Sequence, residues 1–227
     1  MALKIKTHEA KLRTLKTLGY KPFKLSDGNK KLVPNETTAY AIWNIPAIET
    51  CPYRTPDCEK FRYARKAEKA YPSCLPSRQR NYDASLRDDF VFRMTLTLLE
   101  RRKNCRKARL IVRIHESGDF YSADYVGKWL RIMDNCKGED IAFIAYTKSF
   151  PFFDGVELPE NFSLRASLDA SSRGSMRAIV DHNNWNRYEV VPKSDKSYKG
   201  AKCRCEDCAT CNMCISLNIK SIQCEIH

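Results

Sequence analysis

The chain has 227 residues, of which 43% are hydrophobic, and its 40 lysines and arginines outnumber its 27 aspartates and glutamates to give a formal net charge of +13. This composition excludes disorder as the default state, and because no apolar run reaches 18 residues we expect no membrane span. The basic first six residues lead into no apolar stretch or cleavage site, so we expect no secretory signal and predict a cytoplasmic protein.

The first thirty or so residues are rich in lysine and poor in apolar side chains, with Glu9 and Asp27 as the only acidic residues among them. We expect residues 1–37 to form a basic N-terminal arm, either partly ordered or holding a short β element. A solvated tail is the simpler alternative.

From Thr38 onward, short β-branched and aromatic runs alternate with stretches of helical periodicity. Alternation of this kind predicts an α/β fold with a parallel sheet and crossover helices. With five to six strands in about 150 residues, a partial (β/α) barrel over residues 38–200 fits better than a complete eight-stranded one. We predict strands at 39–46, 108–114, 141–146 and 161–168, helices at 87–101 and 122–133, and a further helix or strand at 175–180 and at 188–191.

The strand at 108–114 runs into the polar segment His115-Glu116-Ser117-Gly118-Asp119. In open parallel sheets the ligand site lies beyond the carboxyl ends of the strands, and Lys148 follows the next strand. Side chains of these types serve acid–base chemistry, metal binding or substrate orientation. Alternatively, the segment is a simple strand-to-helix turn in which Asp119 or Ser122 caps the following helix. The candidate catalytic residues are His115, Glu116, Asp119 and Lys148.

The C-terminal segment 202–214 holds five cysteines, four of them in a repeated C-x2-C spacing. In a reducing cytosol, clustered thiols hold metal more often than disulfides. The spacing suits tetrahedral zinc, and it also suits an iron–sulfur cluster, which we favour in the 4Fe–4S form. We therefore predict a cysteine-rich metal-binding tail over residues 201–227. Its candidate ligands are Cys203, Cys205, Cys208, Cys211 and Cys214.

A second pair of cysteines, Cys51 and Cys58, directly follows the first predicted strand. This position allows both thiols to reach the same edge of the sheet as the strand-end polar residues, so they are further candidate ligands. Cys74 is a possible addition, Cys105 and Cys136 are interpreted as non-functional, and Cys224 is ambiguous.

The strong positive charge indicates a polyanionic partner, most often nucleic acid. Arginines with aromatic and amide neighbours suit phosphate contact and base stacking, although charge runs are more commonly solvated helix faces. The candidates for nucleic-acid contact are Arg62, Arg65, Lys66, Arg78, Arg80 and Arg187.

Several of these motifs occur together in one known family. Thr50-Cys51-Pro52, Cys58, the Tyr-Ala-Arg-Lys run at 63–66, the Arg-Asn pair at 80–81 and the run at 85–90 are followed by the segments 113–121, 145–149 and 167–169. Over about residues 39–214 this set resembles the "gene product 88" family of phage and prophage proteins. The resemblance implies a radical-SAM-like partial barrel with a cysteine-bound metal, acting in the host cytoplasm if the chain is phage-encoded.

The chain departs from that family at one position. The family has a third cysteine just before Tyr-Ala, where this chain has Arg62. Radical-SAM chemistry needs three cysteines that leave one iron open, and Cys51-x6-Cys58 lacks the third. The remaining thiols are then expected to join the C-terminal set around one centre.

Three functions follow from these features. The first is a metalloprotein that binds nucleic acid and acts in phage replication, regulation or host takeover. The second is an iron–sulfur enzyme with a strand-end site around His115, Glu116 and Asp119. The third is an inhibitor or binding protein that targets a host protein and uses its metal only structurally.

Overall fold

The computed structural model describes residues 8–29, 31–61, 63–192, 200–203, 208–216 and 218–225, without the side chains of residues 8, 11, 61, 63–65 and 209. In these residues the chain builds a seven-stranded sheet in which all neighbouring strands are parallel, in the order β1-β2-β3-β4-β5-β7-β6. The strands are β1 (Thr38–Trp43), β2 (Arg109–Ile114), β3 (Ile141–Thr147), β4 (Phe162–Leu168), β5 (Arg187–Val191), β6 (Ala201–Lys202) and β7 (Ser221–Glu225).

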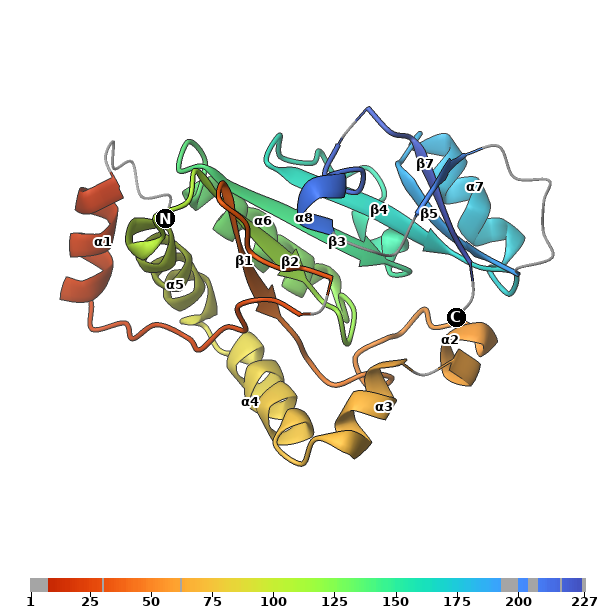
Figure 1. Ribbon diagram of the computed structural model, residues 1–227. Helices are drawn as coiled ribbons and strands as arrows, with labels where there is room; N and C mark the ends of the chain where they lie inside the picture. The colour runs from red at the N-terminus through yellow and green to blue at the C-terminus, as the bar shows by residue number, and fades with distance from the viewer. Residues whose placement is uncertain are drawn as a thin grey trace.

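Helices connect these strands and pack mainly on one face of the sheet (Figure 1). They are α1 (His8–Thr17), α2 (Pro56–Phe61), α3 (Tyr63–Ala70), α4 (Cys74–Leu86), α5 (Phe90–Asn104), α6 (Ala123–Asn135), the 3₁₀ helix η1 (Phe150–Phe153), α7 (Gly174–His182) and α8 (Cys208–Cys211). No helix of the described residues has the length and apolar character needed to cross a membrane.

The strand order explains the architecture. The first five strands follow one another in chain order, and the main crossover helices α5, α6 and α7 lie on the same face. This is the winding of a (β/α) barrel rather than of a doubly wound sheet, whose helices cover both faces. In the described residues β1 and β6 stand at opposite ends of the sheet order. The prediction of an α/β partial barrel is confirmed.

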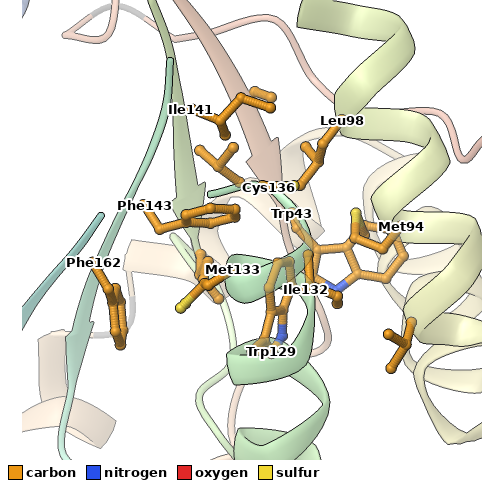
Figure 2. Packing of buried hydrophobic residues seen from close by; sticks show 14 of the residues in the cluster. Trp43, Met94, Leu98, Trp129, Ile132, Met133, Cys136, Ile141, Phe143 and Phe162 are labelled. Atoms are coloured by element: carbon orange, nitrogen blue, oxygen red, sulfur yellow. The ribbon is translucent and has the colours of Figure 1, made fainter. Parts of the chain in front are cut away.

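The main hydrophobic core lies between the sheet and the helices α5 and α6 (Figure 2). Helix α6 buries Tyr125, Val126, Trp129, Ile132 and Met133, a spacing that places all five on one side of the helix. Ser122 caps this helix by accepting a hydrogen bond from the Tyr125 N–H at 3.2 Å, as the turn alternative predicted. The aromatic rings of this core fix the helices against the strands.

The described part of the N-terminal region contains one helix and one short β contact. Residues 8–17 form the helix α1, and its Leu12 and Leu15 are buried in the main core beside α5. Further along, Ser26 forms an antiparallel bridge with Ile42 and so pairs with part of the outer strand β1. The apolar residues of this region are few but well spaced, which is enough to fasten it to the body of the protein.

Candidate functional site

The face of the sheet opposite the main helices borders a cavity of about 990 Å³. Strand residues on this face include Tyr40 on β1, Ile111 and Arg113 on β2, and Ile144 and Tyr146 on β3. Loops at the carboxyl ends of the strands and the C-terminal segment complete its wall. The predicted site residues that line it are His115, Glu116, Asp119, Lys148, Cys51, Cys58, Cys203, Cys208, Cys211 and Cys214.

The loop after β2 is shaped by Asn44 and Gly118. The Asn44 side-chain oxygen accepts hydrogen bonds from the backbone N–H groups of Glu116 and Ser117 at 2.7 and 3.1 Å. Gly118 has a φ of +81°, and a Cβ at this position would lie 2.3 Å from Ile45 Cγ1 and 2.7 Å from Thr50 Oγ1. Only glycine fits there, so the sharp turn before Asp119 is built into the sequence.

Asp119 joins the end of β2 to the end of β3. Its carboxylate accepts hydrogen bonds from Thr147 Oγ1 at 2.5 Å and from the backbone N–H groups of Phe120 at 2.8 Å and Lys148 at 2.9 Å. Burial raises the pKa of Asp119, and these hydrogen bonds only partly oppose that rise. With both oxygens engaged, Asp119 mainly positions the loop.

Lys148 and Asp169 form a buried ion pair at the ends of β3 and β4, with 2.7 Å between Nζ and Oδ2. Asp169 also accepts hydrogen bonds from Thr55 at 2.7 Å and Ser172 at 3.1 Å. Burial opposes ionisation of Asp169, but the charge and hydrogen bonds of Lys148 and the hydroxyl groups outweigh it and hold the pKa of Asp169 below its usual value. This pair ties the β1–α2 loop to the sheet through Thr55.

His115 directly follows β2 and has a φ of +63°, a left-handed conformation that is uncommon for residues other than glycine. Its Nε2 lies 3.1 Å from the Tyr125 hydroxyl, and its ring packs edge-on against Phe120. Burial, reinforced by the charge of Arg113, lowers the pKa of His115 to about 3. The imidazole is therefore neutral near pH 7.

Glu116 differs from its neighbours because it is exposed at the cavity rim, where its carboxylate accepts a hydrogen bond from the Asn29 side chain. All four predicted catalytic residues line the cavity, but only the side chain of Glu116 is exposed to solvent. Its accessibility suits proton transfer better than the buried positions of Asp119 and His115 do.

Cys51 and Cys58 lie in the β1–α2 region at one side of the cavity. Burial, with a contribution from the charge of Asp119, raises the pKa of the Cys51 thiol to about 12, and Cys58 adds to the rise. The two thiols are thus close enough to influence one another. Cys58 itself is exposed.

The C-terminal cysteines lie at the other side of the same cavity. Burial and the neighbouring thiols of Cys214, Cys203 and Cys211 raise the pKa of Cys208 to about 11. Cys205 lies outside the described residues. Among the residues that are described, no three His, Cys, Asp or Glu side chains converge as a ready metal site. The donor chemistry itself, a set of neighbouring thiols, fits zinc or an iron–sulfur cluster.

Arg165 on β4 fastens the C-terminal segment to the sheet. Its fully buried guanidinium donates hydrogen bonds of 2.7–2.8 Å to four backbone carbonyls, those of Met213, Cys214, Ser216 and Ile219. Ser163 on the same strand adds a 2.8 Å hydrogen bond to the Cys214 carbonyl. In this way α8 and the residues after it are held on the face of the sheet opposite α6 (Figure 1).

The residues predicted to contact nucleic acid do not form one described surface. Arg78 is buried and forms a 2.6 Å salt bridge with Glu68, and Arg187 pairs with Asp181. Lys66 and Arg80 are exposed on α3 and α4. Arg62 lies outside the described residues, and the side chain of Arg65 is not described.

Sequence reasoning missed Arg113, Tyr146 and Arg165. A signal was present, because an arginine within an otherwise apolar strand of a parallel sheet is unusual where both faces are covered. Arg113 in the run at 108–114 and Arg165 in the run at 161–168 break the apolar pattern in this way.

Comparison with known proteins places the chain in a family. The family model described as "Gene product 88" matches residues 23–217. The "Gene 88 protein" of Mycobacterium phage L5 is 38% identical over 106 residues, which is 44% of this chain and 43% of that protein. The "Gene 88 protein" of Mycobacterium phage D29 is 36% identical over 110 residues, 44% of this chain and 42% of that protein.

The aligned part therefore spans less than half the length of each of these two phage relatives. No solved structure matches the chain. Because the family model covers most of the chain and takes in both the strand-end site and the C-terminal cysteines, the chain belongs to the gene product 88 family.

Proposed function

We propose that this protein is a metalloenzyme whose active site is the cavity beside the sheet, with a cysteine-bound iron–sulfur cluster, or alternatively zinc, at its wall. One observation carries the proposal: two groups of cysteines far apart in sequence and the strand-end polar residues all line one cavity of about 990 Å³. Small-molecule sites have volumes of roughly 300–1,000 Å³ and lie at the carboxyl ends of parallel strands.

The metal would be held by the C-terminal thiols, Cys203, Cys205, Cys208, Cys211 and Cys214, with Cys51 and Cys58 as further candidates from the opposite wall. A bound cluster supplies electron transfer, whereas zinc supplies a Lewis acid. The residues of the chain itself have distinct tasks. Exposed Glu116 moves a proton at the rim, while Asp119 and the pair Lys148–Asp169 keep the loops in position.

The test is metal and sulfide analysis after anaerobic purification, on the full chain and on the variants C208S, C211S and C214S. We expect iron with acid-labile sulfide, or zinc, in the full chain and a loss of most of it in each variant. C105S is the matched control, because Cys105 does not line the cavity. Equal metal content in all five proteins, or no metal in the full chain, would contradict the proposal.

Nucleic-acid binding is the second candidate function. It is supported by the net charge of +13 and by exposed Lys66 and Arg80 on the neighbouring helices α3 and α4. Phosphate contacts release counterions, so the affinity should fall steeply with salt. The double variant K66E/R80E should weaken binding to DNA or RNA about tenfold or more at low salt. R106E/K137E is the charge-matched control, since Arg106 and Lys137 are exposed in loops outside α3 and α4. Binding that responds equally to both changes would remove α3–α4 as the contact surface.

A further inference from the structure

Arg113 is a cation in the wall of the cavity that has no carboxylate partner among the described residues. It projects from β2 on the cavity face, and its guanidinium carbon lies 3.8 Å from the centroid of the Tyr146 ring. This stacking fixes the plane of the guanidinium. Its Nη1 is buried and has no hydrogen-bond partner in the described part of the chain.

The other basic side chains in the wall have carboxylate partners in the described residues, apart from Lys31, which is exposed. Lys148 pairs with Asp169 at 2.7 Å, Arg54 with Glu59 at 2.6 Å and Lys202 with Glu225 at 2.6 Å. Between residues 8 and 225, where described, no carboxylate oxygen lies within the 4.0 Å of a salt bridge to Arg113. A partly buried guanidinium without an anion is costly, so the site is built to receive one.

We propose that Arg113 forms a subsite for an oxyanion group, a carboxylate or a phosphate, on the small molecule that enters the cavity. The planar guanidinium donates two parallel hydrogen bonds to such a group. The inference rests on the proposed function only in taking the cavity as the ligand site; it does not require the metal. It names the substrate class as a small anion.

The experiment titrates the anaerobically purified full chain with inorganic phosphate and, separately, with succinate. Binding is followed by calorimetry and by the ¹⁵N-resolved NMR signal of the Arg113 Nε–H. We expect at least one anion to bind and to shift that signal. Phosphate and succinate represent the two kinds of oxyanion, a phosphate and a carboxylate. The one that binds more tightly identifies the group that the subsite takes.

Variants locate the binding. R113Q should lower the affinity about 10- to 100-fold, as expected for the loss of a charge-assisted hydrogen bond. The affinity of R113K should lie between those of R113Q and the natural chain, because lysine keeps the positive charge but cannot donate two parallel hydrogen bonds. R54Q is the matched control, since Arg54 lines the same cavity but is already paired with Glu59, and its affinity should change less than about twofold.

The proposal is overturned if neither anion binds the natural chain in the millimolar range, or if R113Q binds as tightly as R54Q. If R113Q does not fold, the Arg113 Nε–H signal of the natural chain provides the test. An anion that binds without shifting this signal also contradicts the subsite. Repeating the titration with the metal-depleted C208S variant separates the two proposals. Anion binding that persists there supports the subsite even if no metal centre exists.

Discussion

The two faces of the sheet carry opposite chemistry, although the same strands supply both. On β2, Leu110, Val112 and Ile114 face the helices and belong to the main core, whereas Arg109 and Arg113 alternate with them on the other face. Strand β4 repeats the pattern, with Leu164 toward the helices and Arg165 toward the C-terminal segment. The two-residue period of the strand therefore separates two environments: one face packs against the helices, and the other lines the cavity.

The largest effect should come from the packed face. Ile114 and Ile111 lie on the same strand and are both fully buried, but Ile114 belongs to the main core and Ile111 lines the cavity. We expect I114A to lower the free energy of unfolding by about 3–5 kcal/mol, because it opens a new hole in a close-packed region. I111A should cost about 2 kcal/mol, since it only enlarges an existing space. Urea denaturation measures both, and equal losses would break the distinction between the faces.

The buried ion pair between Lys148 and Asp169 tests the edge of the sheet where the strands end. D169N leaves Lys148 without its carboxylate and should cost about 3–5 kcal/mol. The control D140N removes a carboxylate that pairs with Arg102 at the surface and should cost less than about 1 kcal/mol. Because the pKa of Asp169 is lowered on folding, its contribution is present above the unfolded pKa of about 3.9 and is lost as the pH falls further. D169N should therefore lose less stability than the natural chain as the pH falls below about 4.

Alanine substitutions at Gly118 and Gly138 separate the cost of backbone strain from the cost of steric conflict. Both have a φ near +80°, but only Gly118 has neighbours where a Cβ would stand. G138A should cost about 1–2 kcal/mol through strain alone. G118A should cost about 2–5 kcal/mol, because displacement of Ile45 and Thr50 adds to the strain. Thermal unfolding of the two variants gives the difference, and similar losses would mean that the loop after β2 yields easily.

The pH response of His115 is the most gradual of these effects, because it builds up over several pH units. Its pKa falls from 6.5 to about 3 on folding, so the unfolded chain binds one more proton between these values. The free energy of unfolding should therefore decrease by up to about 1.4 kcal/mol for each pH unit below 6.5. In H115N, which keeps a residue tolerant of positive φ, this slope should be reduced. A slope that is the same in both proteins would show that His115 titrates normally in the fold.

The sequence alone sufficed for the elements with clear periodicity. The predicted strands at 108–114, 141–146 and 161–168 match β2, β3 and β4 within a residue or two, and the helix at 122–133 matches α6 with Ser122 as its cap. Helices α2, α3 and α4 were not predicted, because residues 56–86 carry many charges and few large apolar side chains. Strand β7 has only five residues and is specified by its pairing with β5.

The candidate site could be predicted only in part from the sequence. Parallel strands end at one edge, so the alternation of strands and helices was enough to group His115, Asp119 and Lys148. That Arg113 stacks on Tyr146 and that Arg165 holds the carbonyls after α8 depends on strand register and on the path of the C-terminal segment. Neither is encoded in local spacing.

The central claim is that cysteines at the wall of this cavity hold a metal. X-ray absorption at the iron and zinc K-edges, on anaerobically purified full-length chain, tests it most directly. We expect iron or zinc with sulfur ligands at about 2.3 Å, and a loss of that signal in C208S but not in C105S. A metal surrounded only by nitrogen and oxygen, or a sulfur signal unaffected by C208S, C211S and C214S, would contradict it.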